Sequence, residues 1–228
     1  MARLATGARW ILRWALRACL AAAALLLVLI FLFRFVDPPA TPYMLAEARR
    51  AGGVDRAWVP LEAIAPHMRR AAVAAEDANF CLHHGFDVAA LRAALEGGAR
   101  RGGSTITQQT VKNVFLWQGR SWPRKALEAL ITPVVEVAWP KARILEIYLN
   151  VAETGPATFG VEAAARDRFG VAAADLGLER AARIAVALPN PKARDPADLS
   201  NAQLRRMRRV MDGAETIRGG ARAACFGG

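Results

Sequence analysis

The stretch "AAEDANFCLHHGFD", residues 74–87, places an acid pair, two histidines and a Gly-Phe-Asp turn directly after an apolar run. That run, "MRRAAVAAE", has apolar positions at intervals of three and four residues, which is typical of a helix with one buried face. Glu76 therefore falls at the end of a predicted helix. A carboxylate at such a position is either a solvated helix end or a group held where a proton is transferred.

Helical spacing recurs in later parts of the chain, in "DVAALRAALEGG", "ARILEIYLNV" and "ERAARIAVAL". Hardly any stretch shows the period-two alternation that is typical of strands. The sequence therefore predicts a mainly α domain over residues 61–212, in which Pro133 and Pro140 kink or divide the helices that they touch. The expected loops are residues 79–87, 96–104, 117–123 and 153–160.

The N-terminus carries a basic segment followed by an apolar one. Residues 18–33 contain no charged side chain and would span roughly 24 Å as a helix, slightly less than a hydrocarbon core of about 30 Å. Four arginines precede this run and only Arg34 closely follows it, which predicts a cytoplasmic N-terminus. We expect residues 1–17 to be cytoplasmic and residues 18–36 to be an uncleaved membrane anchor. A cleaved signal peptide and a buried core helix are the alternatives.

Residues 37–60 are expected to form a linker and juxtamembrane region, because "DPPATP" is stiff and extended. Residues 213–228 are expected to be a loose tail. Of the three cysteines, Cys19 lies in the apolar run, so only Cys81 and Cys225 could pair. Their spacing matches no disulfide framework, and we expect no bridge between them.

The composition limits the class of partner but does not identify the partner. With 54% hydrophobic and 22% charged residues the chain is globular, and its net charge of +11 suits nucleic acid, anionic lipid or a phosphate substrate. The three histidines form no HExxH pattern or other metal-ligand spacing.

A second informative stretch, "GGSTITQQTVKN" at residues 102–113, combines two glycines with a helix start at Ser104 or Thr105. A helix N-terminus favours anions. Two neighbouring rows of polar side chains share one side of the predicted helix: Thr105, Gln108 and Lys112, and Gln109 with Asn113. Taken alone, this segment is more typical of a capped helix with a solvated polar face, and the row of amides with a single lysine is what favours a binding site.

A third stretch, "RKALE", places Arg124 and Lys125 in the first turn of a predicted helix, with Glu128 three and four residues later. Cations there oppose the helix dipole, a cost that an anionic ligand would offset. An ordinary set of helical ion pairs is the alternative. Two carboxylates in separate environments, Glu76 and Glu128, suit chemistry at an acetal carbon, and three cations suit a phosphate leaving group. Together with an anchor, this predicts glycosyl transfer from a lipid pyrophosphate.

These stretches resemble the ordered motifs of the peptidoglycan glycosyltransferases of family 51. "EDANFCLHHGFD" and "GGSTITQQTVKN" are similar to the first two motifs. "RKALE" with "WPKARILEIYLNVAETGPATFGVEAAARDRFG" is similar to the third, "ERAARIAVALPNP" to the fourth and "RRMRRVM" to the fifth. The resemblance covers roughly residues 65–212 and implies a lysozyme-like, mainly α fold. No serine is followed by lysine at the third position, so the chain resembles the monofunctional form without transpeptidase activity.

The resemblance also implies roles for individual residues. Glu76 resembles the general base that deprotonates the acceptor 4-hydroxyl, and Glu128 the second catalytic carboxylate, near the donor pyrophosphate. Lys112, Arg124 and Lys125 would neutralise the leaving pyrophosphate. Residues implied to line the sugar and phosphate cleft are Ser104, Thr105, Gln108, Gln109 and Asn113. Residues implied to support the site are Asp77, Phe80, His83, Asp87 and Glu146. Residues 57–68, with Trp58, Ile64 and Met68, are a candidate for the membrane-proximal apolar surface, and core packing explains these residues equally well.

The implied partners are lipid II, the nascent glycan strand and the membrane, with other wall-synthesis or division proteins as further candidates and no nucleic acid. No cofactor is expected to be required, although a divalent cation (Mg or Mn) could assist the pyrophosphate. The implied location is the bacterial inner membrane, with a periplasmic catalytic domain. A glycan-cleaving enzyme on the same scaffold and a catalytically silent wall-synthesis scaffold are the alternatives.

Overall fold

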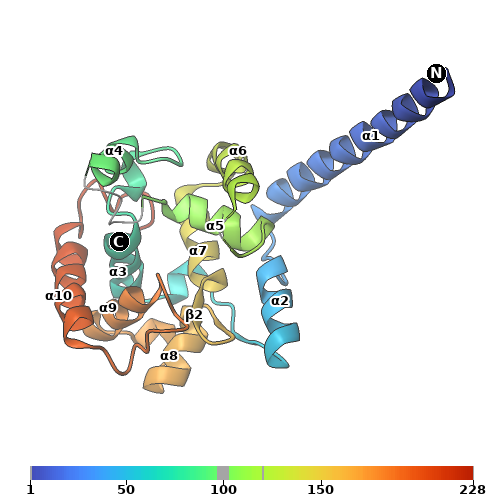
Figure 1. Cartoon of the computed structure of the whole chain (residues 1–228). Helices are drawn as coiled ribbons and strands as arrows, with labels where there is room; N and C mark the ends of the chain where they lie inside the picture. Colours follow the sequence, from blue (N-terminus) through green and yellow to red (C-terminus); the bar gives the residue numbers. More distant parts are fainter. Residues whose placement is uncertain (1, 97–102, 120, 228) are drawn as a thin grey trace. The chain divides into compact units, whose positions relative to one another are not determined.

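The computed structural model describes residues 2–96, 103–119 and 121–227, so most of the glycine-rich turn predicted at 96–104 lies outside the described residues. The chain forms two compact units, Met1–Asp37 and Pro38–Gly228. It is mainly helical, as predicted (Figure 1). The helices are α1 (Ala2–Phe33), α2 (Pro42–Ala51), α3 (Pro66–Glu76), α4 (Val88–Glu96), α5 (Ile106–Phe115), α6 (Trp122–Ala138), α7 (Lys141–Val151), α8 (Val161–Phe169), α9 (Leu178–Ala187) and α10 (Asn201–Thr216). Short 3₁₀ turns are η1 (Leu61–Ala63), η2 (Phe80–Leu82) and η3 (Ala173–Asp175).

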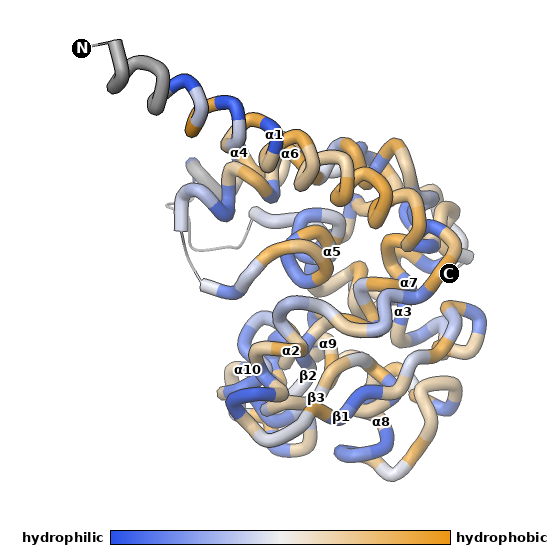
Figure 2. The backbone as a smooth tube through the Cα atoms, turned by 90° about the vertical axis from the view of Figure 1, so that its right-hand side faces the viewer, coloured by the Kyte–Doolittle hydropathy of each residue, from blue (hydrophilic) through white to orange (hydrophobic). Residues whose placement is uncertain are grey.

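The first unit is dominated by α1, whose stretch Arg9–Phe33 is 25 residues long and has a mean hydropathy of 2.7. Figure 2 shows the same helix as mostly hydrophobic, with its hydrophilic turns confined to the N-terminal half. Its length of about 37 Å, at 1.5 Å per residue, exceeds the roughly 30 Å of a hydrocarbon core. One N-terminal apolar helix of this kind is consistent with a single-pass membrane anchor.

The core of the second unit forms where α3, α9 and α10 pack together. Alanine side chains are small, so the backbones of these helices can approach one another closely. Fully buried alanines on the three helices are Ala71, Ala72, Ala181, Ala182, Ala185 and Ala214. Gly213 of α10 continues the pattern, since a Cβ atom there would lie 3.2 Å from the Ala74 side chain. The helix that ends at Glu76 is therefore held on two sides.

A second layer is built by α5, which packs against both α6 and α7. The α7 helix is central, and its side chains Ile144, Ile147, Tyr148 and Leu149 are almost wholly buried. Pro140 serves as its N-cap and separates it from α6, as predicted. Pro133 does not end α6, which continues to Ala138.

A small sheet occupies the region predicted as a loop at 153–160. Its strands are β1 (Asp55–Arg56), β2 (Glu153–Gly155) and β3 (Thr158–Phe159), in the order β1-β3-β2. β3 pairs parallel with β1 and antiparallel with β2. Strands of two or three residues are too short to show an alternating pattern, so the sequence did not reveal them.

The C-terminal segment is folded, which corrects the expectation of a loose tail. Residues after α10 form a series of turns in which Ile217, Ala223 and Phe226 are buried. Arg69 of α3 donates a hydrogen bond from Nη1 to the Phe226 carbonyl at 3.2 Å. The tail is therefore folded onto the domain, which its glycine-rich composition concealed.

The expectation that Cys81 and Cys225 stay unpaired was wrong, because they form a disulfide. The two cysteines are 144 residues apart in sequence, and their Cα atoms lie 5.5 Å apart. Packing of α10 against α3 brings the tail to the turn that follows α3, which no local spacing could indicate.

Candidate active site

Glu76 is the last residue of α3, and its carboxylate is largely buried. Oε2 accepts a hydrogen bond from Gln109 Nε2 at 2.9 Å, and Arg206 Nη2 lies 3.6 Å from Oε1. Among the described residues no donor forms a hydrogen bond to the buried Oε1 atom. Burial raises the pKa of Glu76 above its usual range, while the Gln109 hydrogen bond and the charges of Arg206, Arg194 and Lys112 act against this increase. A buried carboxylate with an unused oxygen and a raised pKa is suited to accept a proton.

Asp77 joins the end of α3 to the start of α5. Its carboxylate lies 2.9 and 3.1 Å from His83 Nε2, and Oδ2 accepts the backbone N–H of Ile106 at 3.0 Å. The Thr105 hydroxyl donates to the Gly85 carbonyl at 2.6 Å, which ties the same loop to α5 a second time. These bonds fix the position of Gln109, one turn further along α5, relative to Glu76.

The polar residues of α5 divide into two groups. Thr105 and Gln108 form a capping box in which each side chain bonds the other residue's backbone N–H, and both are buried. Their polar atoms hold the helix start. Thr105 also borders a cavity beside Glu76, whereas Gln108 lines neither that cavity nor the one lined by Gln109. Gln109, Lys112 and Asn113 instead line a cavity of about 240 Å³.

Glu128 lies on the buried side of α6 and is 2% exposed. Arg124 Nη1 lies 2.6 Å from Oε2, and Lys125 Nζ pairs with Oε1. Lys125 also donates to the Ser104 hydroxyl at 3.0 Å. The three charged residues predicted from "RKALE" therefore form one cluster, which is linked to the turn before α5.

Lys112 lies within electrostatic reach of both carboxylates. Burial lowers the pKa of Lys112, while the negative charges of Glu128 and Glu76 act in the opposite direction. The Arg124 and Lys125 charges lower this pKa further. Both carboxylate groups therefore act electrostatically on Lys112, which lines the cavity beside Gln109.

A second cavity, of about 230 Å³, lies beside Glu76 and Asp77 and is also lined by Ser104 and Thr105. Gln109, which lines the first cavity, donates to Glu76, which lines the second. Glu76 therefore borders one cavity directly and is joined to the lining of the other through the Gln109 amide.

The residues predicted to support the site have different partners. Phe80 is fully buried, with Lys141 Nζ 4.4 Å from its ring centroid. Asp87 begins α4 by accepting the Ala90 backbone N–H at 2.8 Å. Glu146 pairs with Arg143 and accepts the Leu61 backbone N–H at 3.2 Å, so it caps η1 and lies away from the Glu76 and Glu128 clusters.

Sequence reasoning missed the side chains that reach Glu76 from distant segments. Arg206 comes from α10, and Arg194 lies between α9 and α10. Tyr148 of α7 is fully buried near the same carboxylate, with its hydroxyl 3.5 Å from Gln109 Oε1. The "RRMRRVM" stretch offered the available signal for Arg206, although four arginines in one run do not show which of them faces the site.

Comparison with known proteins identifies the family. The family model described as Transglycosylase matches residues 44–215, well over half of the chain. The chain belongs to the transglycosylase family. This transglycosylase is 56% identical over 214 residues to a biosynthetic peptidoglycan transglycosylase of Jannaschia sp. (strain CCS1), a match covering 94% of this chain and 90% of the relative.

Two further relatives carry the same name. The one from Rhodospirillum centenum is 51% identical to this transglycosylase over 185 residues, covering 78% of this chain and 80% of the relative. The one from Caulobacter vibrioides is 50% identical over 168 residues, covering 72% and 73%. The resemblance found in the sequence is confirmed at the level of the family and of the mainly α fold.

Proposed function

We infer that this protein is a monofunctional peptidoglycan glycosyltransferase that extends glycan strands from lipid II. Glu76 takes the proton from the GlcNAc 4-hydroxyl of lipid II. The freed oxygen attacks the anomeric carbon of the growing strand, the bond to the lipid pyrophosphate breaks, and inversion produces a β-1,4 linkage. The observation that carries this mechanism is the buried Glu76 carboxylate, which borders one cavity and accepts a hydrogen bond from Gln109 of the other. Its Oε1 atom accepts no hydrogen bond from the described residues.

The leaving pyrophosphate gains negative charge as the glycosidic bond breaks, and preorganised cations stabilise such charge. Lys112, Arg124 and Lys125 supply these cations, and Ser104 adds a hydroxyl beside Lys125. Glu128 holds two of the three cations and so acts as an orienting carboxylate. A divalent cation that enters with the pyrophosphate would add to the positive charge that stabilises the leaving group. Such a cation needs no dedicated set of protein ligands.

A glycan-cleaving enzyme is the second candidate, since it also uses a buried carboxylate. Its leaving group is a sugar hydroxyl, for which a three-cation cluster has no function. The deciding experiment incubates the detergent-solubilised full chain with labelled lipid II and, separately, with labelled glycan strands. Polymer from lipid II supports the glycosyltransferase. Shortened strands without any polymer would overturn it.

Lys112→Met is expected to lower kcat for polymerisation by about 10²-fold, because it removes one charge from the site of the developing pyrophosphate. Lys112→Arg keeps the charge and is expected to retain most of kcat. Initial rates with fluorescent lipid II measure both variants. A Lys112→Met enzyme with unchanged kcat and a raised KM would contradict this role, because the lysine would then act only in ground-state binding.

The proposed localisation rests on two observations that agree. The apolar helix with arginines on its N-terminal side favours a cytoplasmic N-terminus and an exported catalytic domain. The Cys81–Cys225 disulfide is typical of an oxidising compartment outside the cytoplasm. We therefore place the chain in the bacterial inner membrane with the domain in the periplasm, where it can meet other wall-synthesis or division proteins.

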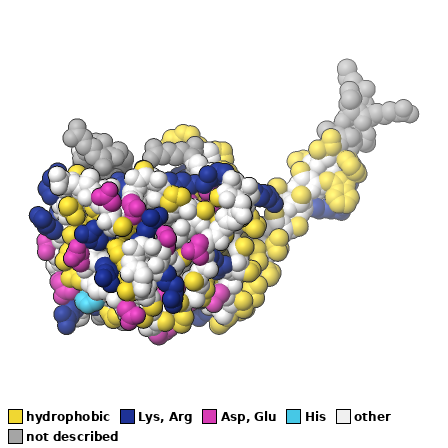
Figure 3. Space-filling model, turned by 90° about the horizontal axis from the view of Figure 1, so that it is seen from below, with side chains coloured by type: hydrophobic (Ala, Val, Ile, Leu, Met, Phe, Trp, Pro, Cys, Tyr) yellow, Lys and Arg dark blue, Asp and Glu magenta, His cyan; other side chains and the backbone are white. Residues whose placement is uncertain are grey.

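On the face drawn in Figure 3, basic side chains alternate with acidic and uncharged ones, unlike the continuous stripe of a nucleic-acid site.

The apolar surface of the domain lies on α6. Of the two alternatives for residues 57–68, core packing holds for Ile64 and Met68, which are fully buried. On α6 the large apolar side chains at helical spacing are exposed, while Arg124 and Glu128 are buried on the opposite side. The exposed set is Leu127, Leu130, Val134 and Val137, with Trp122 before it. We propose that this stripe contacts the bilayer and the lipid chain of the substrate.

The double variant Leu130→Gln/Val137→Gln is expected to lower kcat/KM for long-chain lipid II in liposomes by about tenfold, which corresponds to about 1.4 kcal/mol of lost apolar contact. Activity on a short-chain lipid II analogue should change little, because the cleft is untouched. Leu45→Gln, at an exposed leucine of α2, is the matched control. Equal losses on both substrates would contradict a lipid contact.

A further inference from the structure

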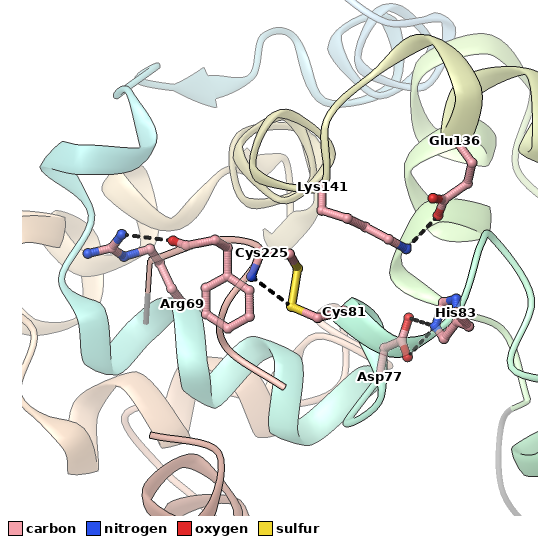
Figure 4. Close-up of a disulfide and its surroundings, with 8 residues drawn as sticks. Arg69, Asp77, Cys81, His83, Glu136, Lys141 and Cys225 are labelled. Carbon is pink, nitrogen blue, oxygen red and sulfur yellow. Dashed lines mark hydrogen bonds and ion pairs between the residues drawn. A yellow bond between two sulfur atoms is a disulfide. The ribbon is translucent and has the colours of Figure 1, made fainter. Parts of the chain in front are cut away.

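The turn after Glu76 is covalently attached to the end of the chain. Cys81 lies in η2, between Asp77 and His83, and its disulfide partner Cys225 lies in the C-terminal turns (Figure 4). The backbone N–H of Cys225 also donates to Cys81 Sγ at 3.3 Å. The disulfide is thus attached to the short segment that connects the proposed base to its supporting residues.

The tail that carries Cys225 is anchored independently of the bridge. Ala223 and Phe226 are buried, and the Phe226 carbonyl accepts a hydrogen bond from Arg69, near the start of α3. Figure 4 shows this contact and the disulfide as two attachments of the tail to the region of α3 and η2. Because Arg69 precedes Glu76 on α3 and Cys81 follows it, the tail spans the helix that ends at the base.

Residues in and beside η2 also contact the elements that form the proposed active site. Asp77 and His83 pair across the turn, and Asp77 holds the Ile106 backbone N–H at the start of α5. The buried Phe80 packs under Lys141, whose Nζ lies 2.8 Å from Glu136 of α6. A shift of η2 would therefore move the start of α5, and with it the Gln109 amide that contacts Glu76.

We infer that the Cys81–Cys225 disulfide is a positioning brace for the transfer reaction, which holds the end of α3 against α5 and makes the activity depend on the redox state of the chain. The inference rests on the proposed function through the role of Glu76. Cleaving the bridge should loosen residues 77–83 without unfolding the domain, because the α3–α9–α10 core and the buried Phe80 persist.

The redox step balances with a dithiol reductant. Dithiothreitol transfers two electrons and two protons to the Cys81–Cys225 bridge, which becomes two thiols, while the reagent becomes its own cyclic disulfide. Reoxidation by thiol–disulfide exchange with a disulfide reagent reverses the change. Cys19, which lies in α1 and is free, is removed as Cys19→Ser to make the response specific.

The experiment compares oxidised and reduced full-length protein in detergent, as the wild type, Cys19→Ser, and Cys81→Ser/Cys225→Ser. Reduction is expected to lower kcat on lipid II about tenfold in the first two, and the double variant should show the low value without any response to reductant. Far-UV circular dichroism should be unchanged. Unchanged kcat in a chain whose thiols titrate as free would overturn the inference. A loss of kcat that tracks loss of helical signal would also overturn it, because the bridge would then only stabilise the fold.

The pH profile separates positioning from stability. Charged or titratable groups facing Glu76 are Lys112 of α5, Tyr148 of α7, Arg206 of α10, Arg194 and the adjacent Asp77. If reduction lets water reach Glu76, its raised pKa should fall, and the acid limb of kcat/KM should move to lower pH. A smaller kcat with an unmoved acid limb would contradict a displaced Glu76.

Hydrogen exchange tests the brace without relying on activity. Reduction is expected to lower amide protection at residues 77–83 and at the start of α5. Loss of protection confined to residues 217–227 would overturn the inference. If neither redox form makes polymer, the proposed function fails, and hydrogen exchange alone then decides whether the bridge positions the α3–α5 junction.

Discussion

Replacing Glu76 with glutamine should lower kcat for glycan polymerisation by about 10²–10⁴-fold, the usual contribution of a positioned general base. Glutamine has the same shape, and its side-chain oxygen can still accept the Gln109 hydrogen bond that Glu76 accepts at 2.9 Å. The variant therefore removes the proton acceptor and leaves the packing. Labelled lipid II polymerisation measures the loss, and Glu62→Gln, at an exposed glutamate, is the matched control.

Stability should move in the opposite direction from activity. Because burial raises the pKa of Glu76 in the folded chain, ionisation at neutral pH costs the folded state free energy that the unfolded state does not lose. Glu76→Gln removes this cost, so its thermal unfolding midpoint should equal or exceed that of the wild type at pH 7. A variant that is both inactive and strongly destabilised would show that Glu76 is a structural residue.

The raised pKa of Glu76 also determines how activity depends on pH. The base must be ionised, so activity should fall as the pH drops through the folded-state pKa of Glu76, which lies above the ordinary value of about 4.3 for glutamate. The pH profile of kcat/KM measures this limb in the free enzyme. An acid limb at or below about 4.3 would contradict the assignment of Glu76 as base.

Glu128→Gln should affect stability and activity together. Arg124 and Glu128 are 8% and 2% exposed, and removing one member of a buried ion pair leaves the other charge uncompensated. The expected loss is about 3–5 kcal/mol of unfolding free energy, which lowers the thermal midpoint by roughly 10 °C. Polymerisation should fall at least 10²-fold, because Arg124 and Lys125 lose the carboxylate that orients them toward the pyrophosphate.

A double variant separates these two effects. Arg124→Met/Glu128→Leu replaces the buried pair with apolar side chains of similar volume, which is often neutral for stability. It should recover most of the thermal midpoint and stay inactive. Recovery of activity in the double variant would show that the pair only maintains the fold.

The sequence allowed the helices and the charged clusters to be predicted, because both depend on local spacing. Arg124, Lys125 and Glu128 lie within one helical turn or so of each other, and the structure brings them together as that spacing suggests. The Glu76–Gln109 contact was not predictable from spacing, since it joins the end of one helix to another that begins thirty residues later. Resemblance placed both residues in one site, and the structure shows which atoms meet.

Other features were hidden for physical reasons. Thr105 and Gln108 share a helix face with Lys112, but their polar atoms satisfy the helix start, a use that residue type alone does not reveal. The α6 helix was misleading because the common expectation of charge outside and apolar residues inside is partly reversed there: Arg124 and Glu128 are buried, while Leu130 and Val137 are exposed. Arg206 and Cys225 reach the region of Glu76 only through the packing of α10 on α3, which depends on the whole fold.

The reversed polarity of α6 also affects how the protein can be handled. A chain that begins after α1 would lose its anchor, yet it would keep Trp122, Leu130 and Val137 on an exposed helix. Contiguous apolar surface of this kind promotes self-association in water. If the domain contacts the bilayer through α6, as proposed above, removal of α1 alone would leave this apolar stripe in place, and we expect the shortened chain to self-associate in water.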